Sequence, residues 1–211
     1  MFALEQSLVP VSPEVQAVFA RTWRQIAGMG TWWSGPERVA IAQLSRTHRM
    51  GKVATDTSLP ASANDAIAVL AFAPAVTTQE WVDGIVASIG LERYIELVGI
   101  VSRVVAVDTV TRLLGCVLEP LPSPTTGSPS RSPSPLSVKK RSTWVAMASP
   151  PVPPNVLAAV PAAQQTMIEV TEALYMTGPE MADPDITISG LHRTQIEVVA
   201  TTTSLANECF Y

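Results

Sequence analysis

The residues best suited to chemistry in this sequence are a cysteine and a glutamate near its end, Cys209 and Glu197. Cysteine reacts as the thiolate, so a reactive thiol needs a neighbour that lowers its pKa and a route for its oxidant. The two residues are 12 positions apart, which in a straight helix is about 3.3 turns and places them on broadly the same side. Glu197 could there relay a proton, although its charge alone would raise the pKa of the thiol. The alternative interpretation is that Cys209 packs beside Phe210 and does no chemistry.

A similar stretch earlier in the chain indicates an internal duplication. Residues 91–98 resemble residues 191–199 with an offset of one residue, so Glu96 matches Glu197. Asp108 stands 12 residues after Glu96, at the place that the cysteine occupies in the later copy. The duplication therefore predicts two related helical halves.

Other polar and sulfur-containing residues have simpler interpretations. His48 and His192 are too far apart in sequence for metal-ligand spacing, so no metal site is predicted, and no motif indicates a cofactor. Cys116 is isolated and is interpreted as a packing residue. Asp108 and Arg112 are spaced i, i+4 and predict a salt bridge within one helix.

Helix start and stop signals are frequent, and they predict an all-α chain. Ser12 and Pro13 are a cap and a first helical residue, and Gly28 is a stop. The capping-box pattern S/T-x-x-D/E begins at Ser34 and recurs later in the chain. The segment 91–114 is rich in β-branched residues, which also suit a strand, but its length and charge spacing favour helix. The other expected helices begin at Ser62 and Thr77 and cover 164–177 and 189–211.

A change of composition separates the two expected halves. Of the 18 prolines, 11 lie between Pro120 and Pro161, mixed with Ser and Thr. Proline removes backbone donors and fixes φ, which predicts an extended connector held down by burial of Trp144 and Met147. The expected organisation is an N-terminal helical repeat at 1–118, a Pro/Ser-rich connector at 119–154 and an incomplete C-terminal repeat at 155–211.

Composition narrows the classes of function. Hydrophobic residues make up 47% of the chain and charged residues only 15%, which predicts that part of the surface is buried in a homo-oligomer. A net charge of −4 argues against nucleic acid as the partner. Charged residues interrupt the longest apolar run, which argues against a membrane span. Two cysteines make no disulfide framework, so a cytoplasmic protein is expected.

Several blocks of the sequence resemble one known family. Residues 193–211 are similar to the core motif of alkylhydroperoxidase D-like proteins, which runs Arg-x-x-x-Glu, a helix with Ser and Asn, then Cys-x-x-Cys and a histidine. Residues 30–42, 94–101 and 155–157 are similar to other blocks of its two-repeat, peroxidase-related branch. The chain thus resembles the alkylhydroperoxidase D / carboxymuconolactone decarboxylase family over most of its length outside the connector.

The resemblance implies an AhpD-like helical fold with two pseudo-repeats joined by the connector. It implies a thiol-dependent peroxide reductase that uses no cofactor and takes electrons from a dithiol donor protein. Cys209 matches the first, resolving cysteine of the family motif, and Glu197 matches its proton-relay glutamate.

The sequence departs from the family pattern at its end. The position of the second cysteine would follow Tyr211, and neither His48 nor His192 matches the histidine of the motif. We therefore expect the sequence to be incomplete within this motif and inactive as a peroxidase as given. Two alternatives stay open: an enzyme of the carboxymuconolactone decarboxylase branch, which needs no dithiol, and a non-catalytic helical oligomer or binding scaffold with exposed polyproline segments.

Overall fold

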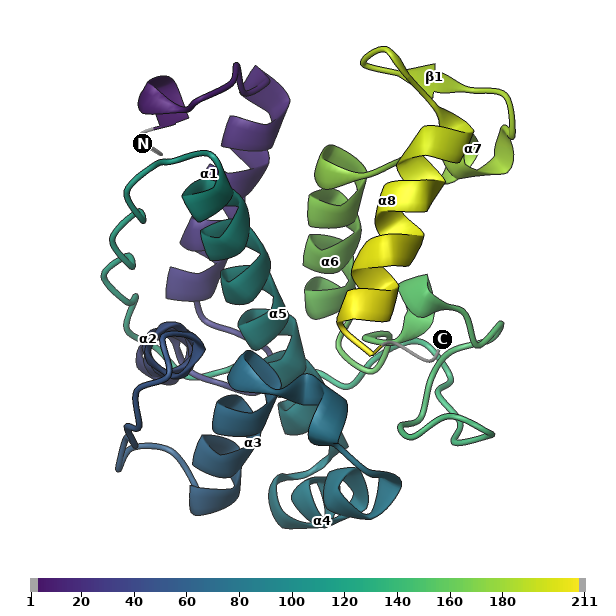
Figure 1. Ribbon diagram of the computed structural model, residues 1–211. Helices are drawn as coiled ribbons and strands as arrows, with labels where there is room; N and C mark the ends of the chain where they lie inside the picture. Colours follow the sequence, from purple (N-terminus) through teal and green to yellow (C-terminus); the bar gives the residue numbers. More distant parts are fainter. Residues whose placement is uncertain (1–3, 209–211) are drawn as a thin grey trace. The chain divides into compact units, whose positions relative to one another are not determined.

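The computed structural model describes residues 4–208, which form two compact units. Unit 1 ends at Val170 and unit 2 begins at Thr171. The described chain is mostly helical, with one small two-stranded sheet (Figure 1). The prediction of a helical chain is therefore confirmed at this coarse level, whereas Cys209 lies outside the described residues.

Unit 1 is built around the long helix α5. Helix α2 packs against both α3 and α5, and α1 packs against α2. The buried side chains of these helices form one continuous apolar core. The helices of this unit are α1 (Pro13–Ala27), α2 (Gly35–Arg49), α3 (Ala61–Phe72), α4 (Gln79–Ile89), α5 (Leu91–Leu113) and the first part of α6 (Pro161–Leu174), with short 3₁₀ turns at Leu4–Gln6, Pro74–Val76 and Pro153–Asn155.

Unit 2 contains the end of α6, the short helix α7 (Gly178–Ala182), a small hairpin and the helix α8 (Arg193–Ala206). Strand β1 (Thr187–Ile188) pairs antiparallel with β2 (Leu191–His192). The hairpin leads directly into α8, so the helix expected from residue 189 onward begins at Arg193 instead.

Capping residues set the helix starts, and the caps predicted at Ser12 and Ser34 are found. The Ser12 hydroxyl accepts a hydrogen bond from the backbone N–H of Val15 at 3.2 Å, as expected. The backbone N–H of Ser34 donates to the Glu37 carboxylate at 2.7 Å, as a capping box requires. The box predicted at Ser62 is wrong: α3 begins one residue earlier, and the Ser62 hydroxyl lies 2.6 Å from that of Ser88.

The segment 91–113 is a helix, as its length predicted. Its buried residues recur every three or four positions and include Ile95, Val101 and Val104. Tertiary packing of such a stripe outweighs the weak helix preference of β-branched residues, because most helix stability in proteins comes from burial. Gly90 makes the turn between α4 and α5. Its φ of +89° is an angle that residues with side chains rarely adopt.

The Pro/Ser-rich connector is attached to the helices of unit 1. Its Thr125 N–H donates to the carbonyl of Ala27 at 2.9 Å, which ties it to the end of α1. A side chain at Gly35 would place its Cβ 2.3 Å from the carbonyl oxygen of Thr125, so only glycine permits this contact. Met147 is buried and Trp144 packs against the core, which confirms the expected anchors.

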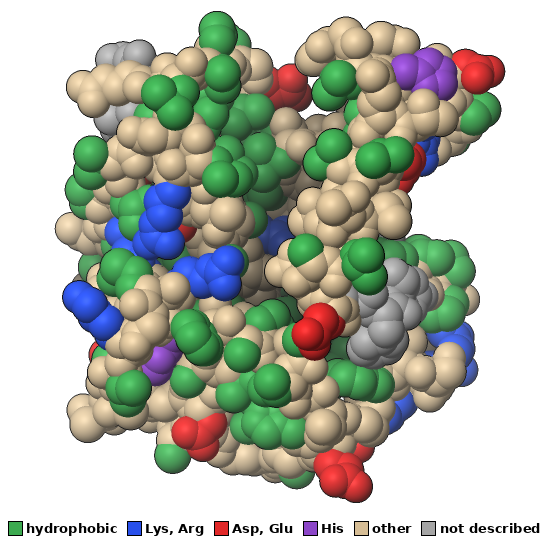
Figure 2. Space-filling model, viewed as in Figure 1, with side chains coloured by type: hydrophobic (Ala, Val, Ile, Leu, Met, Phe, Trp, Pro, Cys, Tyr) green, Lys and Arg blue, Asp and Glu red, His purple; other side chains and the backbone are tan. Residues whose placement is uncertain are grey.

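Two surface properties of the described chain bear on function. None of its helices is long and apolar enough to cross a membrane. On the face drawn in Figure 2, Lys and Arg side chains form separate small groups and no continuous basic patch.

Candidate active site

Unit 1 holds a pocket of about 380 Å³ whose walls come from five parts of the chain, one of which is α2 through Arg38. Helix α5 supplies one wall through Glu96, Ile100 and Arg103. Helix α1 and the loop after it supply a second wall, and the start of α6 supplies a third. Ser128 and Ser130 of the connector complete the lining. This volume suits a small organic molecule.

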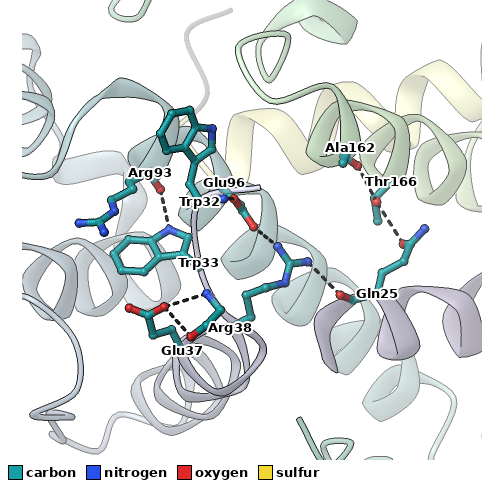
Figure 3. Close-up of polar contacts among 10 residues, drawn as sticks. Gln25, Trp32, Trp33, Glu37, Arg38, Arg93, Glu96, Ala162 and Thr166 are labelled. Atoms are coloured by element: carbon teal, nitrogen blue, oxygen red, sulfur yellow. Dashed lines mark hydrogen bonds and ion pairs between the residues drawn. The ribbon is translucent and has the colours of Figure 1, made fainter. Parts of the chain in front are cut away.

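Glu96 is the buried acid of the pocket. Its residue is only 1% exposed. One carboxylate oxygen accepts a hydrogen bond from the backbone N–H of Trp32 at 2.6 Å, and the other contacts the guanidinium of Arg38 (Figure 3). Burial raises the pKa of Glu96, and the charge of Arg38 opposes that rise. Burial therefore favours the protonated form of Glu96, whereas Arg38 favours its ionised form.

Arg38 links Glu96 to the helix α1. Its Nη2 donates to the backbone carbonyl of Gln25 at 3.0 Å, so the guanidinium bridges α1 and α5. Gly30 makes this approach possible, because a Cβ there would lie 1.8 Å from Oε1 of Glu96 and 2.6 Å from Nη1 of Arg38. Only glycine at position 30 allows the backbone of this loop to lie so close to the Glu96–Arg38 ion pair.

Arg103 is a second cation in the pocket, and it has no acidic partner among the described residues. Its Nε and Nη1 atoms are buried without a hydrogen-bond partner, and its Nη2 donates to the Ser102 hydroxyl at 3.2 Å. Burial lowers the pKa of Arg103 to about 10, so the group still carries its charge at neutral pH.

The pocket therefore combines a neutral ion pair with an additional positive charge. Glu96 and Arg38 compensate each other, while the charge of Arg103 remains uncompensated within the described part of unit 1. An uncompensated buried charge is costly unless a ligand of opposite charge binds to it. The arrangement suits proton transfer at Glu96 to an anionic ligand.

Asp108, the other acid of the first copy, has a structural role. Its carboxylate accepts two hydrogen bonds from Arg46, from Nε and from Nη2, each at 2.8 Å. The predicted salt bridge between Asp108 and Arg112 is therefore wrong, because Arg46 on α2 reaches the buried carboxylate across the helix packing. Arg46 also donates to the backbone carbonyl of Glu119, which ties this pair to the segment that follows α5.

Glu197 of the later copy lies in unit 2 and is held by two neighbours. The hydroxyl of Tyr175 donates to its Oε1 at 2.8 Å, and Nε of Arg193 donates to the same oxygen at 2.7 Å. These hydrogen bonds, that of Tyr175 first, lower the pKa of Glu197. Glu197 also borders a shallow surface hollow of unit 2. Its predicted partner Cys209 lies outside the described residues, so the pairing of the two stays a prediction.

The sequence indicated only one member of the pocket. The duplication drew attention to Glu96 through its match to Glu197, but it gave no role to Arg38 or Arg103. The spacing of Glu96 and Arg103, seven residues on one helix, is the signal that could have identified a common face. The tryptophans of the loop act as supports: Trp33 is fully buried, and its indole N–H donates to the carbonyl of Arg93 at 2.9 Å.

Residues that could bind a metal do not gather in the described chain. No three His, Cys, Asp or Glu side chains between residues 4 and 208 come close enough to hold an ion. Cys116 is free and buried, and it is not part of the pocket lining.

No protein-family model, curated protein or solved structure matches this chain.

Proposed function

We propose that unit 1 is an acid–base enzyme that transfers a proton to a small substrate, as expected for the carboxymuconolactone decarboxylase branch of the family that the sequence resembles. The observation that supports this proposal is the buried carboxyl of Glu96 in the wall of a pocket. A general acid works best when its pKa lies near the working pH, and burial moves the pKa of Glu96 in that direction.

The proposed reaction is the loss of CO₂ from a lactone acid. The bond between the substrate carbon and its carboxylate breaks, and the bonding electrons remain on the substrate. Glu96 donates a proton to the substrate, so each turnover consumes one proton and releases one CO₂. Arg38 stabilises the Glu96 carboxylate that remains, and water returns the proton to it.

The first prediction concerns Glu96→Gln. This substitution keeps the size of the side chain but removes its acidic proton, so CO₂ release from a carboxylated γ-lactone should fall by at least about 100-fold. Glu92→Gln is the matched control, because Glu92 lies one turn earlier on α5 and does not line the pocket. A Glu96→Gln variant as active as the control would contradict the proposal.

A second candidate is the thiol-dependent peroxide reductase implied by the closing segment. The observation that favours it is Glu197, held near the start of α8 by Tyr175 and Arg193. In that reaction a dithiol is oxidised to a disulfide while a hydroperoxide is reduced to an alcohol and water. Cys209 would be one of the two thiols, and the given sequence has no residue that matches the second.

The same set of variants separates the two candidates. CO₂ release that survives Cys209→Ser and is lost in Glu96→Gln selects the acid–base enzyme. Reduction of tert-butyl hydroperoxide by a dithiol reductant that is lost in Cys209→Ser and Glu197→Gln, but not in Glu96→Gln, selects the peroxide reductase. If every variant matches the wild type with both substrates, the non-catalytic scaffold remains.

A further inference from the structure

We infer that Arg131 of the connector is a positioning residue for Glu96, because it lies over the ring of Trp32 and so fixes the backbone N–H that binds the Glu96 carboxylate. Arg131 does not line the pocket, so it acts on the acid only through Trp32. It also lies outside every block that resembles the family, so the resemblance implies no role for it. This role deepens the proposed function and rests on it, because it takes Glu96 as the proton donor.

The connector is bonded to the loop that carries Trp32. The backbone N–H of Arg131 donates to the carbonyl of Thr31 at 2.8 Å, and that of Ser130 donates to the carbonyl of Gly30 at 3.4 Å. The guanidinium carbon of Arg131 lies 5.7 Å from the centre of the Trp32 ring, within the range of a cation–π contact. Backbone hydrogen bonds and a side-chain contact therefore join the connector to this loop.

The backbone of Arg131 adopts a conformation that its surroundings must hold. Its φ is +55°, in the left-handed region that residues with side chains rarely adopt. A residue other than glycine persists there only where its contacts fix it, and such positions cluster at functional sites. The hydrogen bond to Thr31 and the contact with Trp32 supply this constraint, and both belong to the loop that binds Glu96.

Trp32 passes the constraint on to Glu96. Its backbone N–H donates to Oε2 of Glu96 at 2.6 Å (Figure 3). Burial raises the pKa of Glu96, and the charge of Arg38 opposes that rise. The backbone N–H groups of Trp32 and Trp33 oppose it as well. A hydrogen bond favours the ionised carboxylate only while its donor is held in place, so a looser loop should favour the protonated acid.

The other charges around Glu96 stay unchanged when Arg131 is replaced. Arg38 of α2 pairs with the carboxylate, and Arg103 of α5 lines the same pocket. The parts of α1, α6 and the connector that line the pocket supply no charged side chain. A change in the ionisation of Glu96 therefore reports on the loop.

The experiment measures the ionisation of Glu96 directly and needs no substrate. Carbon-13 NMR of protein labelled at the glutamate carboxyl carbons follows each group against pH, and Glu96→Gln identifies the signal of Glu96. Arg131→Gly removes the side chain and accepts the φ of +55° without strain. We expect it to lower the ionisation constant of Glu96 by about two- to fivefold, which is what one exposed cation–π contact contributes.

Two further variants are the controls for Arg131→Gly. Arg131→Lys keeps a cation that can lie over the ring, so the ionisation constant of Glu96 should stay close to that of the wild type. Arg141→Gly is the matched control, because Arg141 is an exposed arginine of the same connector and does not line the pocket. It should leave the constant unchanged. An ionisation constant that is the same in Arg131→Gly and the wild type would overturn the inference.

A double variant shows whether Arg131 acts through the ring of Trp32. Trp32→Leu removes the ring but keeps the backbone N–H that binds Glu96. In this background Arg131→Gly should have no further effect on the ionisation of Glu96. An equal effect of Arg131→Gly in both backgrounds would mean that the charge of Arg131 acts directly, and the positioning role would be wrong.

Failure of the inference can be told apart from failure of the proposed function. The NMR signal reports the ionisation of Glu96 whether or not this group transfers a proton to a substrate. If Arg131→Gly leaves the ionisation unchanged and Glu96→Gln still abolishes CO₂ release, the acid–base enzyme stands and the positioning role is wrong. If Arg131→Gly shifts the ionisation but Glu96→Gln releases CO₂ as fast as Glu92→Gln, the positioning role stands and the acid–base enzyme is wrong.

Discussion

Glu96 has both features of a working acid, burial and a cationic partner. Desolvation favours its protonated form, and Arg38 together with the N–H of Trp32 favours its ionised form. A buried ion pair contributes little net stability compared with apolar residues of the same volume.

Glu96 should make the stability of the protein depend on pH. Its pKa in the folded protein is raised above the ordinary value of 4.5, so over the interval between the two values the folded state holds a proton that the unfolded chain has released. The free energy of unfolding therefore falls as pH rises through this interval. Urea unfolding at several pH values should show this fall in the wild type relative to Glu96→Gln. A difference between the two proteins that does not change with pH, or grows in the opposite direction, would contradict it.

Gly30 allows a test of the close approach that builds the ion pair. A Cβ at this position would meet Glu96 Oε1 at 1.8 Å, so Gly30→Ala should lower the free energy of unfolding by about 1–3 kcal/mol through overpacking. Gly84→Ala is the matched control, because no atom lies within 4 Å of the Cβ that it adds to α4. The control should raise stability by about 0.5–1 kcal/mol, since alanine favours helix over glycine. Chemical denaturation measures the free energy of unfolding of the two variants. If Gly30→Ala changed it no differently from Gly84→Ala, the loop would have room to shift.

At the scale of elements, α5 places the carboxyl of Glu96 and the guanidinium of Arg103 on one face. Glu96 and Arg103 share the pocket wall, while apolar residues of the same helix pack into the core. The connector has a larger role than its composition predicted, because Ser128 and Ser130 line the pocket and Thr125 is tied to α1. A segment that looked like a spacer therefore forms part of the site.

The start of α4 gives a prediction at this scale. The sequence indicated Thr77 as the cap, but the hydroxyl of Thr78 accepts the hydrogen bond from the N–H of Trp81 at 3.2 Å. Thr78→Ala should therefore lower the free energy of unfolding by about 1 kcal/mol. In Thr77→Ala the loss should be smaller, because that hydroxyl only donates to the carbonyl of Pro74 outside the helix. Thermal denaturation of the two variants compares them, and a larger loss in Thr77→Ala would favour the sequence-based assignment.

At the scale of the whole molecule, the glutamates of the two similar stretches, Glu96 and Glu197, have different surroundings. Glu96 is buried in the pocket of unit 1, whereas the side chain of Glu197 in unit 2 is 40% exposed. Helix α8 has no buried residue, and its Val198 and Leu205 are exposed. The homo-oligomer expected from the low charge content stays a prediction, as does the dithiol donor protein.

The sequence by itself determined most of the helices, because helix starts and stops depend on local chemistry. The cap at Ser12, the box at Ser34 and the glycine stops are read from neighbouring residues, and they agree with the structure. The cap predicted at Ser62 is wrong because α3 begins at Ala61, and Asn64 instead accepts a hydrogen bond from the backbone N–H of Asp56 in the preceding loop. The similarity of residues 91–98 to 191–199 drew attention to Glu96 but predicted none of its neighbours.

Only the tertiary structure decided which charged groups meet. Arg38 reaches Glu96 across 58 residues, and Arg46 reaches Asp108 across 62. Sequence spacing favours local pairs such as Asp108 with Arg112, because only neighbours within one helix have distances that the sequence fixes. The pairing between helices follows from how α1, α2 and α5 pack, and so does the isolation of Arg103. The site is therefore a property of helix packing, which no single segment of the sequence contains.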